Sequence, residues 1–147
     1  MTDMSPPQSY DFELTPQNMS TALDWVENCV TESASNERQI FGVRLCVEEL
    51  LANLLSHVKS QIVNVEINIQ PDASGIGLIL TNNGPLFNPL EKEARMLDSD
   101  IDAARLGGWG VPILHHFSDR FEYRSAGDNN VVVLYFSESP GASNSRV

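Results

Sequence analysis

The fold is decided by residues 37–81, ERQIFGVRLCVEELLANLLSHVKSQIVNVEINIQPDASGIGLILT, because the hydrophobic period changes within this stretch. Over residues 37–59 apolar side chains recur every three or four positions, the spacing of one face of a helix. From Val63 apolar and polar residues alternate, which is typical of a strand with one buried face. A turn cluster at 71–75 and a second apolar run at 76–81 complete a hairpin. The stretch therefore predicts a long amphipathic helix followed by an antiparallel hairpin.

Shorter elements are expected before this stretch. Residues 10–14 alternate between apolar and acidic side chains and predict a short strand. Thr15 and Pro16 are a suitable N-cap and first-turn residue for a helix over 16–30. The long helix that follows should present one apolar stripe to the core, made of Ile40, Val43, Val47, Leu50, Leu51, Leu54, Leu55 and Val58.

The C-terminal half is expected to contain a short helix and a second hairpin. Residues 111–117 predict a short helix, and 121–136 predict a second hairpin whose turn spans 127–130. Helices segregated from antiparallel hairpins are typical of the α+β class. We therefore expect a two-layer sandwich with helices on one face of a mixed, mainly antiparallel sheet.

Length and composition fit one globular domain. The chain has 147 residues, of which 41% are hydrophobic, enough for a real core without disulfides. We expect a single domain over residues 10–136, a flexible N-terminus over 1–9 and a flexible tail over 137–147. Cys29 and Cys46 are expected to be reduced, buried thiols.

Charge and hydropathy exclude several classes of protein. The formal net charge of -11 disfavours direct nucleic-acid binding, because phosphate backbones require clustered Lys and Arg. No apolar run approaches the ~20 residues that span a bilayer, so we expect no membrane association. Residues 1–5 lack the basic and apolar regions of a signal peptide, and we expect a cytoplasmic protein.

Three segments contain residues suited to chemistry, and the first lies inside the long helix. Glu49, Asn53 and His57 are spaced i, i+4, i+8 and form a polar line on one helix face. A carboxylate and an amide oxygen suit Mg²⁺, and the carboxylate could also accept a proton from an attacking hydroxyl. The alternative is that these residues are simply the solvent edge of an amphipathic helix.

The second and third segments are rich in glycine. Residues 81–89, TNNGPLFNP, follow a strand, and Gly84 would allow close approach of a flat ligand; the alternative is an ordinary Asn-Gly turn. Residues 107–110, GGWG, open the short helix, where backbone N–H groups could meet a phosphate; the alternative is a flexible hinge. The third segment fits neither the Rossmann nor the Walker pattern.

Together, in order and spacing, the three segments resemble the N, G1 and G2 boxes of the GHKL ATPase family. That family includes gyrase, heat-shock chaperones, histidine kinases and mismatch-repair ATPases. Three sequence segments are similar to those of the small anti-sigma-factor serine kinases of bacterial partner-switching systems: VEELLANLLSHV, LTNNGPLFNPLE and GGWGVPILHHFSDRFEY. The resemblance spans residues 10–136 and implies a Bergerat-type ATP-binding fold.

The resemblance also implies roles for matching residues. Glu49 would be the general base toward a serine hydroxyl, and Asn53 the ligand of Mg²⁺. Asn82 and Gly84 would contact the adenine of ATP. The phosphates would be held by Gly108 and Gly110, and residues 90–106 would form a lid that contains Arg95 and Arg105, of which Arg105 is assigned to the nucleotide.

Two positions depart from the family pattern. Asn82 and Asn88 stand where the G1 box usually has aspartate. An amide accepts through its carbonyl or donates through its NH₂, but without the charge that strengthens a carboxylate hydrogen bond, a difference on the order of 1–2 kcal/mol. His57 is as well explained by a structural role at the helix end. We assign no transition metal to His115 and His116, because adjacent helical residues point about 100° apart.

Two functions from different classes follow from the resemblance. The first is an ATP-dependent serine kinase and anti-sigma factor, which binds a sigma factor and phosphorylates a serine of an anti-sigma-factor antagonist protein. The alternative, motivated by Asn82 and Asn88, is a catalytically degenerate module that sequesters a protein partner with weak or no nucleotide binding. A histidine kinase is disfavoured because no helix pair with a phospho-acceptor histidine precedes the first segment. The resemblance is compatible with a homodimer.

Overall fold

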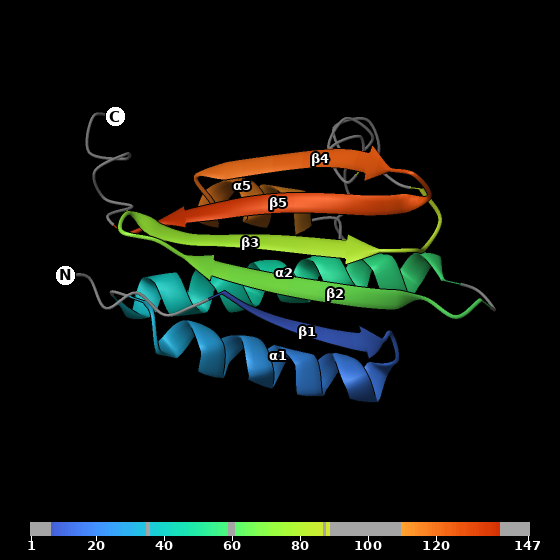
Figure 1. Ribbon diagram of the computed structural model, residues 1–147, viewed down its shortest axis with the longest axis horizontal. Coiled ribbons are helices and arrows are strands. Elements are labelled where there is room, and N and C mark those ends of the chain that lie inside the picture. Colours follow the sequence, from blue (N-terminus) through green and yellow to red (C-terminus); the bar gives the residue numbers. More distant parts are fainter. Residues whose placement is uncertain (1–6, 35, 59–60, 87, 89–109, 139–147) are drawn as a thin grey trace.

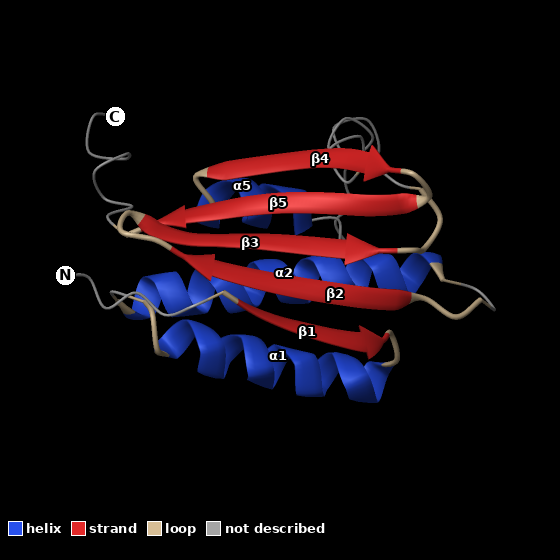
Figure 2. Cartoon of the chain, in the orientation of Figure 1, coloured by secondary structure: helices blue, strands red, loops and turns tan. Residues whose placement is uncertain are grey.

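The chain folds into two layers, a β-sheet and a set of helices on one of its faces (Figures 1 and 2). The computed structural model describes residues 7–34, 36–58, 61–86, 88 and 110–138. The elements in chain order are β1 (Gln8–Glu13), α1 (Pro16–Thr31), α2 (Glu37–His57), β2 (Asn64–Pro71), β3 (Gly75–Asn82), α5 (Gly110–Phe117), β4 (Arg120–Ala126) and β5 (Asn129–Ser137). The predicted α+β two-layer sandwich is confirmed.

The sheet has five strands in the order β1-β2-β3-β5-β4. Every pairing between the described strands is antiparallel, whereas the sequence predicts a mixed, mainly antiparallel sheet. One row across the sheet shows the register, with each residue opposite the next: Tyr10, Ile67, Leu80, Val132 and Tyr123. This register sets the ends of β3 and β5 side by side, and these ends contain the polar residues discussed below.

Among the described helices, the central helix α2 makes the largest contribution to the core, and α1 follows closely. The predicted stripe of α2 is confirmed in the middle, where Val43, Val47 and Leu51 are fully buried, while Ile40 and Leu55 are only half-buried. Full burial of such side chains contributes about 1.5–3 kcal/mol each, before the opposing loss of conformational entropy is counted. Burial of this stripe holds α2 against the sheet.

The helix termini explain why α1 and α2 begin where they do. The Thr15 hydroxyl accepts a hydrogen bond from the backbone N–H of Asn18, and Pro16 occupies the first turn of α1. The Asn36 side chain accepts from the backbone N–H of Gln39 in the same way. Each cap satisfies a backbone donor that the helix itself leaves without a partner.

Both hairpin turns are tighter than the sequence predicts. Pro71 belongs to β2 and Gly75 to β3, because one carboxylate oxygen of Asp72 accepts from the N–H groups of Ser74 and Gly75 and closes the turn. The second turn likewise involves only Gly127, with φ +64°, and its neighbour Asp128. The prediction of a turn through residue 130 is therefore wrong, and β5 begins at Asn129.

Two further properties bear on the sequence predictions. Cys29 and Cys46 are both free thiols and both buried, as predicted. Among the described helices, none combines the length and apolarity needed to cross a membrane.

Candidate functional site

The C-terminal half of α2 contains the predicted polar line. Glu49 and Asn53 are half-buried, and His57 is exposed at the last residue of the helix. The His57 ring nitrogen Nδ1 lies 2.8 Å from the carbonyl oxygen of Asn53, and the Ser56 hydroxyl donates to the same oxygen at 2.7 Å. These contacts fall on a carbonyl of the last helical turn, so they support the structural interpretation of His57.

Glu49 also influences a neighbouring thiol. Burial first, and the negative charge of Glu49 second, raise the pKa of Cys46 to about 12. A thiol with such a pKa stays protonated at neutral pH and is a poor nucleophile. Cys46 is therefore part of the core and not part of the chemistry.

The second segment begins at the end of β3, where Asn82 is directly opposite Asn130 of β5. Asn82 is only 6% exposed and Asn130 only 2%. The Oδ1 atom of Asn82 accepts from the backbone N–H of Gly84 at 2.9 Å and from Nδ2 of Asn130 at 3.0 Å. Nδ2 of Asn130 also donates to the carbonyl of Pro85 at 3.0 Å. The polar turn after β3 is thus tied to β5 by the Asn130 side chain.

The first two segments meet in space. A cavity of ≈ 30 Å³ separates α2 from the sheet here, and it is lined by Leu50, Asn53, Leu54, Leu80, Asn82, Asn130 and Val132. Asn53 and Asn82 are therefore brought together, although they are far apart in the sequence. The cavity has room for a water molecule or two. A purine base is larger, so binding one requires the surrounding side chains to move apart.

Gly84 is buried in this region, and its small size is needed for packing within the chain. A Cβ atom on Gly84 would lie 3.1 Å from Oδ1 of Asn82 and 3.2 Å from Cδ1 of Leu54. Both distances are tighter than ordinary van der Waals contact. The close approach that the structure records at Gly84 is to Asn82 and Leu54.

The third segment is described only in part. Gly110 is the first residue of α5, as expected for the last glycine of the segment. Gly108 lies outside the described residues, as does the predicted lid over residues 90–106 with Arg95 and Arg105. Asn88 is described and half-buried.

Sequence reasoning missed Asn130 and Tyr123. The Tyr123 hydroxyl donates to Oδ1 of Asn130 at 2.7 Å and so holds the amide that contacts Asn82. A signal for Asn130 was present, because the alternation of Val132, Leu134 and Phe136 places residue 130 on the same inward face when it is extended back by two positions. No comparable signal identifies Tyr123, whose role depends on the pairing of β4 with β5.

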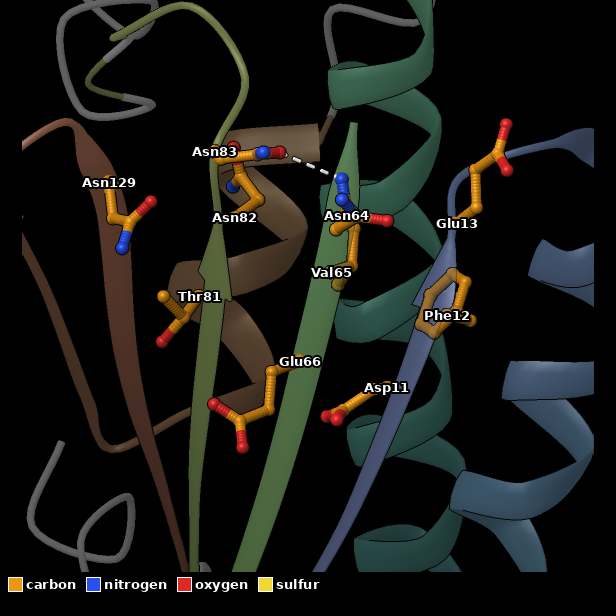
Figure 3. Close-up of a pocket in the computed structure, with 10 residues that line it drawn as sticks. All are labelled: Asp11, Phe12, Glu13, Asn64, Val65, Glu66, Thr81, Asn82, Asn83 and Asn129. Atoms are coloured by element: carbon orange, nitrogen blue, oxygen red, sulfur yellow. Dashed lines mark hydrogen bonds between the residues drawn. The ribbon is translucent and has the colours of Figure 1, made fainter. Parts of the chain in front are cut away.

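A larger hollow of ≈ 490 Å³ lies at the same end of the sheet (Figure 3). Its exposed acidic side chains are Asp11, Glu13 and Glu66, and the Asn83 side chain accepts from the backbone N–H of Asn64 at 2.7 Å beside them. Of the predicted site residues it includes only Asn82. Clustered carboxylates would repel phosphates, so this hollow does not suit a nucleotide.

The donor set of the smaller cavity can be compared with the needs of a nucleotide and its metal. The amide oxygen of Asn53 is a ligand type that Mg²⁺ accepts, whereas no group of three His, Cys, Asp or Glu side chains gathers anywhere among the described residues. An Mg²⁺ ion bound through Asn53 would therefore need phosphate oxygens or water as its other ligands, as is usual for this ion.

Comparison with known proteins identifies the class. The model of the histidine kinase-like ATPase domain matches residues 12–136, and the chain belongs to this family. It is similar to the serine/threonine-protein kinase BtrW of Bordetella bronchiseptica, with 23% identity over 132 residues, which cover 88% of this chain and 93% of that protein. The resemblance of the three segments to this family is thereby confirmed.

Proposed function

We propose that this protein is an ATP-dependent serine kinase that also acts as an anti-sigma factor. In this proposal it binds ATP with Mg²⁺ and transfers a phosphoryl group to a serine of an anti-sigma-factor antagonist protein. The observation that carries the proposal is that Asn53 of α2 and Asn82 of β3 line one cavity between helix and sheet. Membership of the histidine kinase-like ATPase family and likeness to a serine/threonine kinase support it.

Each proposed residue has a distinct task. Glu49 would accept the proton of the serine hydroxyl as its oxygen bonds to the transferred phosphorus. Asn53 would bind Mg²⁺ through its amide oxygen. Gly110, at the first position of α5, would offer its backbone N–H to phosphate oxygens. Gly108 and Arg105, outside the described residues, are proposed to complete the phosphate contacts. Bound ATP supplies the phosphoryl group, and ADP is the leaving group.

The test is a titration of the purified protein with Mg²⁺-ATP by calorimetry, together with transfer of labelled phosphate to a purified antagonist protein. Asn53→Ala should weaken binding by about tenfold or more, because it removes a metal ligand. Glu49→Ala should retain binding but lower phosphotransfer by about a hundredfold or more, because it removes the general base. Loss of binding in Glu49→Ala, with transfer per bound ATP unchanged, would contradict the assigned role.

Matched controls separate chemistry from stability. Glu48→Ala removes a neighbouring, equally half-buried carboxylate of α2, and Asn68→Ala removes a half-buried amide of β2 outside the proposed site. Both variants should bind ATP and transfer phosphate like the wild type.

The partner assignments rest on the resemblance to partner-switching kinases and have their own test. The proposed partners are a sigma factor, the antagonist protein and a second copy of the chain, and the proposed location is the cytoplasm. Co-elution of the purified chain with a sigma factor should depend on the nucleotide supplied. If no nucleoside triphosphate binds at millimolar concentration while a sigma factor still co-elutes, the kinase is rejected and the sequestering module stands in its place.

A further inference from the structure

Two hydrogen bonds determine which way the Asn82 amide points. The backbone N–H of Gly84 can only donate, and it lies 2.9 Å from Oδ1 of Asn82. Nδ2 of Asn130 donates to the same oxygen at 3.0 Å. Rotating the Asn82 amide by 180° would set its NH₂ group against both donors, which is why the network defines its orientation. The acceptor atom of Asn82 is therefore occupied by the chain itself.

The orientation of Asn130 is determined independently. Its Nδ2 atom also lies 3.0 Å from the carbonyl oxygen of Pro85 and 3.5 Å from that of Gly84, and carbonyl oxygens only accept. Its Oδ1 atom accepts from the Tyr123 hydroxyl at 2.7 Å. Asn130 must accordingly present its NH₂ group to Asn82, and the two amides form one directional network.

The NH₂ group of Asn82 is what remains for a ligand. Among the described residues this nitrogen has no hydrogen-bond partner, although the side chain is more than nine-tenths buried and lines the cavity with Asn53. Every fully buried side-chain nitrogen or oxygen in the described part of the chain has a partner. The Asn82 nitrogen must therefore keep contact with open space, where it can donate to a bound molecule.

The chemistry of the purines makes this donor selective. Adenine has an amino group at position 6, which donates, whereas hypoxanthine and guanine have a carbonyl oxygen there, which accepts. An aspartate at position 82 would offer an acceptor to the adenine amino group, but Asn82 opposes that group with a second donor. We infer that Asn82 makes the base site select a purine nucleoside triphosphate with an oxygen at position 6 over ATP. The inference rests on the proposed nucleotide binding, and it specifies which purine base the proposed site at Asn53 and Asn82 favours.

Inosine and adenosine triphosphates test the inference in the wild-type protein, because they differ only at position 6 and in the proton on the adjacent ring nitrogen. Calorimetric titration with each, in the presence of Mg²⁺, should give a dissociation constant about tenfold lower for ITP, the effect of one matched against one opposed hydrogen bond. ATP binding as tightly as ITP, or more tightly, overturns the inference and leaves the proposed kinase intact. Binding of neither nucleotide overturns both.

A charge-matched pair of variants locates the effect. Asn82→Asp keeps an oxygen for the Gly84 N–H and turns the second group into an acceptor, so the preference should reverse in favour of ATP by about tenfold. Asn83→Asp introduces the same charge one residue away, where the side chain accepts from the Asn64 N–H at 2.7 Å in the neighbouring hollow (Figure 3). Its ITP-to-ATP ratio should stay within about twofold of the wild type.

Circular dichroism establishes that each variant is folded before titration. A folded Asn82→Asp protein with an unchanged ratio overturns the assignment to Asn82. If the buried charge prevents folding of this variant, the wild-type ratio alone decides, and Asn82→Ser provides a second folded variant in which the preference for ITP should fall.

Discussion

The two ends of the β3–β5 strand pair differ in how their buried polar side chains are hydrogen-bonded. At the end near the turn after β2, Nε2 of Gln39 donates to the carbonyls of Phe136 and Ser137 at 3.0 and 3.2 Å, and Asp72 accepts from two backbone N–H groups and from the Tyr135 hydroxyl. At the opposite end, Asn82 is equally buried but only its oxygen is bonded among the described residues. At the first end the side chains of Gln39 and Asp72 are hydrogen-bonded within the chain. At the second end the NH₂ group of Asn82 has no partner among the described residues and is available to a ligand.

The comparison teaches that buried polarity alone does not mark a functional site. Gln39 is 4% exposed and Asn82 is 6% exposed, so burial does not distinguish them. What differs is whether each buried donor has a partner within the chain, because an unmatched buried group costs about 1–3 kcal/mol and persists where a ligand makes use of it. The predictions below test whether the first end is purely structural.

The largest effect is expected at the start of β3. A Cβ atom on Gly75 would lie 2.2 Å from the carbonyl oxygen of Phe136, which is backbone and cannot rotate away. Gly75→Ala should lower the free energy of unfolding by about 3 kcal/mol, because the two strands must separate to admit the methyl group. Urea denaturation measures this change.

Gly77→Ala is the control, since its nearest contact would be at 3.5 Å, an ordinary distance. It should change stability by less than about 1 kcal/mol, with a slight gain expected for alanine over glycine in a strand. Equal losses in the two variants would contradict the account of Gly75.

The next effect concerns the link between α2 and β5. Gln39→Ala removes the donor to two carbonyls at the end of β5 and should cost about 2 kcal/mol in urea denaturation, because those carbonyls lose their buried partner. If this end is purely structural, nucleotide affinity should not change. Gln70→Ala removes an exposed amide whose partner among the described residues is Asn68, and should alter stability by less than about 0.5 kcal/mol.

A smaller effect is expected at the end with Asn82. Tyr123→Phe removes the hydrogen bond that the Tyr123 hydroxyl donates to Asn130, and should cost about 1 kcal/mol in thermal or urea unfolding. Tyr10→Phe is a suitable control, because Tyr10 is also half-buried but stacks on Trp25 at 5.1 Å through its ring. If the Tyr10 variant loses as much stability as the Tyr123 variant, the hydroxyl contact is not the cause.

The smallest effect is a pH dependence at the structural end. Burial first, and the hydrogen bond to Asp72 second, raise the pKa of Tyr135 to about 12, above the ordinary value of 10.0. The unfolded chain then loses this proton at lower pH than the folded one, so the contribution of Tyr135 is complete below pH 10 and is lost as the pH rises toward about 12.

Urea denaturation at pH 9 and pH 11 checks this prediction by comparing the wild type with Tyr135→Phe. The wild type should lose more stability than the variant between the two pH values, by less than about 1 kcal/mol, because Asp72 is exposed and Tyr135 is only half-buried, so solvent screens their interaction. Parallel losses in the two proteins would show that other groups dominate the alkaline transition.

Much of the fold could be predicted from local periodicity. The alternation from Val63 to Ile69 gave the buried face of β2, and the stripe containing Val43, Val47 and Leu51 gave the face of α2 toward the sheet. Both signals are repeated over many residues, so single exceptions do not obscure them. The turns were predicted less well, because Asp72 and Gly127 close them through individual hydrogen bonds and backbone angles.

The candidate site was predictable in its parts but not in its connections. The spacing of Glu49 and Asn53 indicated a shared helix face, and Asn82 and Gly84 marked the end of β3 and the turn that follows it. The contact of Asn82 with Asn130 joins positions 48 residues apart and depends on strand register, to which no local pattern refers. The direction of the Asn82 amide depends on that contact, so it too required the structure.

The rate at which a thiol reagent modifies the two buried cysteines would report how often the helices open. Cys46 is fully buried on α2 and Cys29 is 5% exposed on α1, and burial raises the pKa of both. A thiol reagent can therefore modify either one only during excursions in which the helices lift from the sheet. Because Cys46 is on the same helix as Asn53, a ligand that holds α2 against β3 would slow the labelling of Cys46. The native cysteine can therefore report ligand binding without an engineered label site.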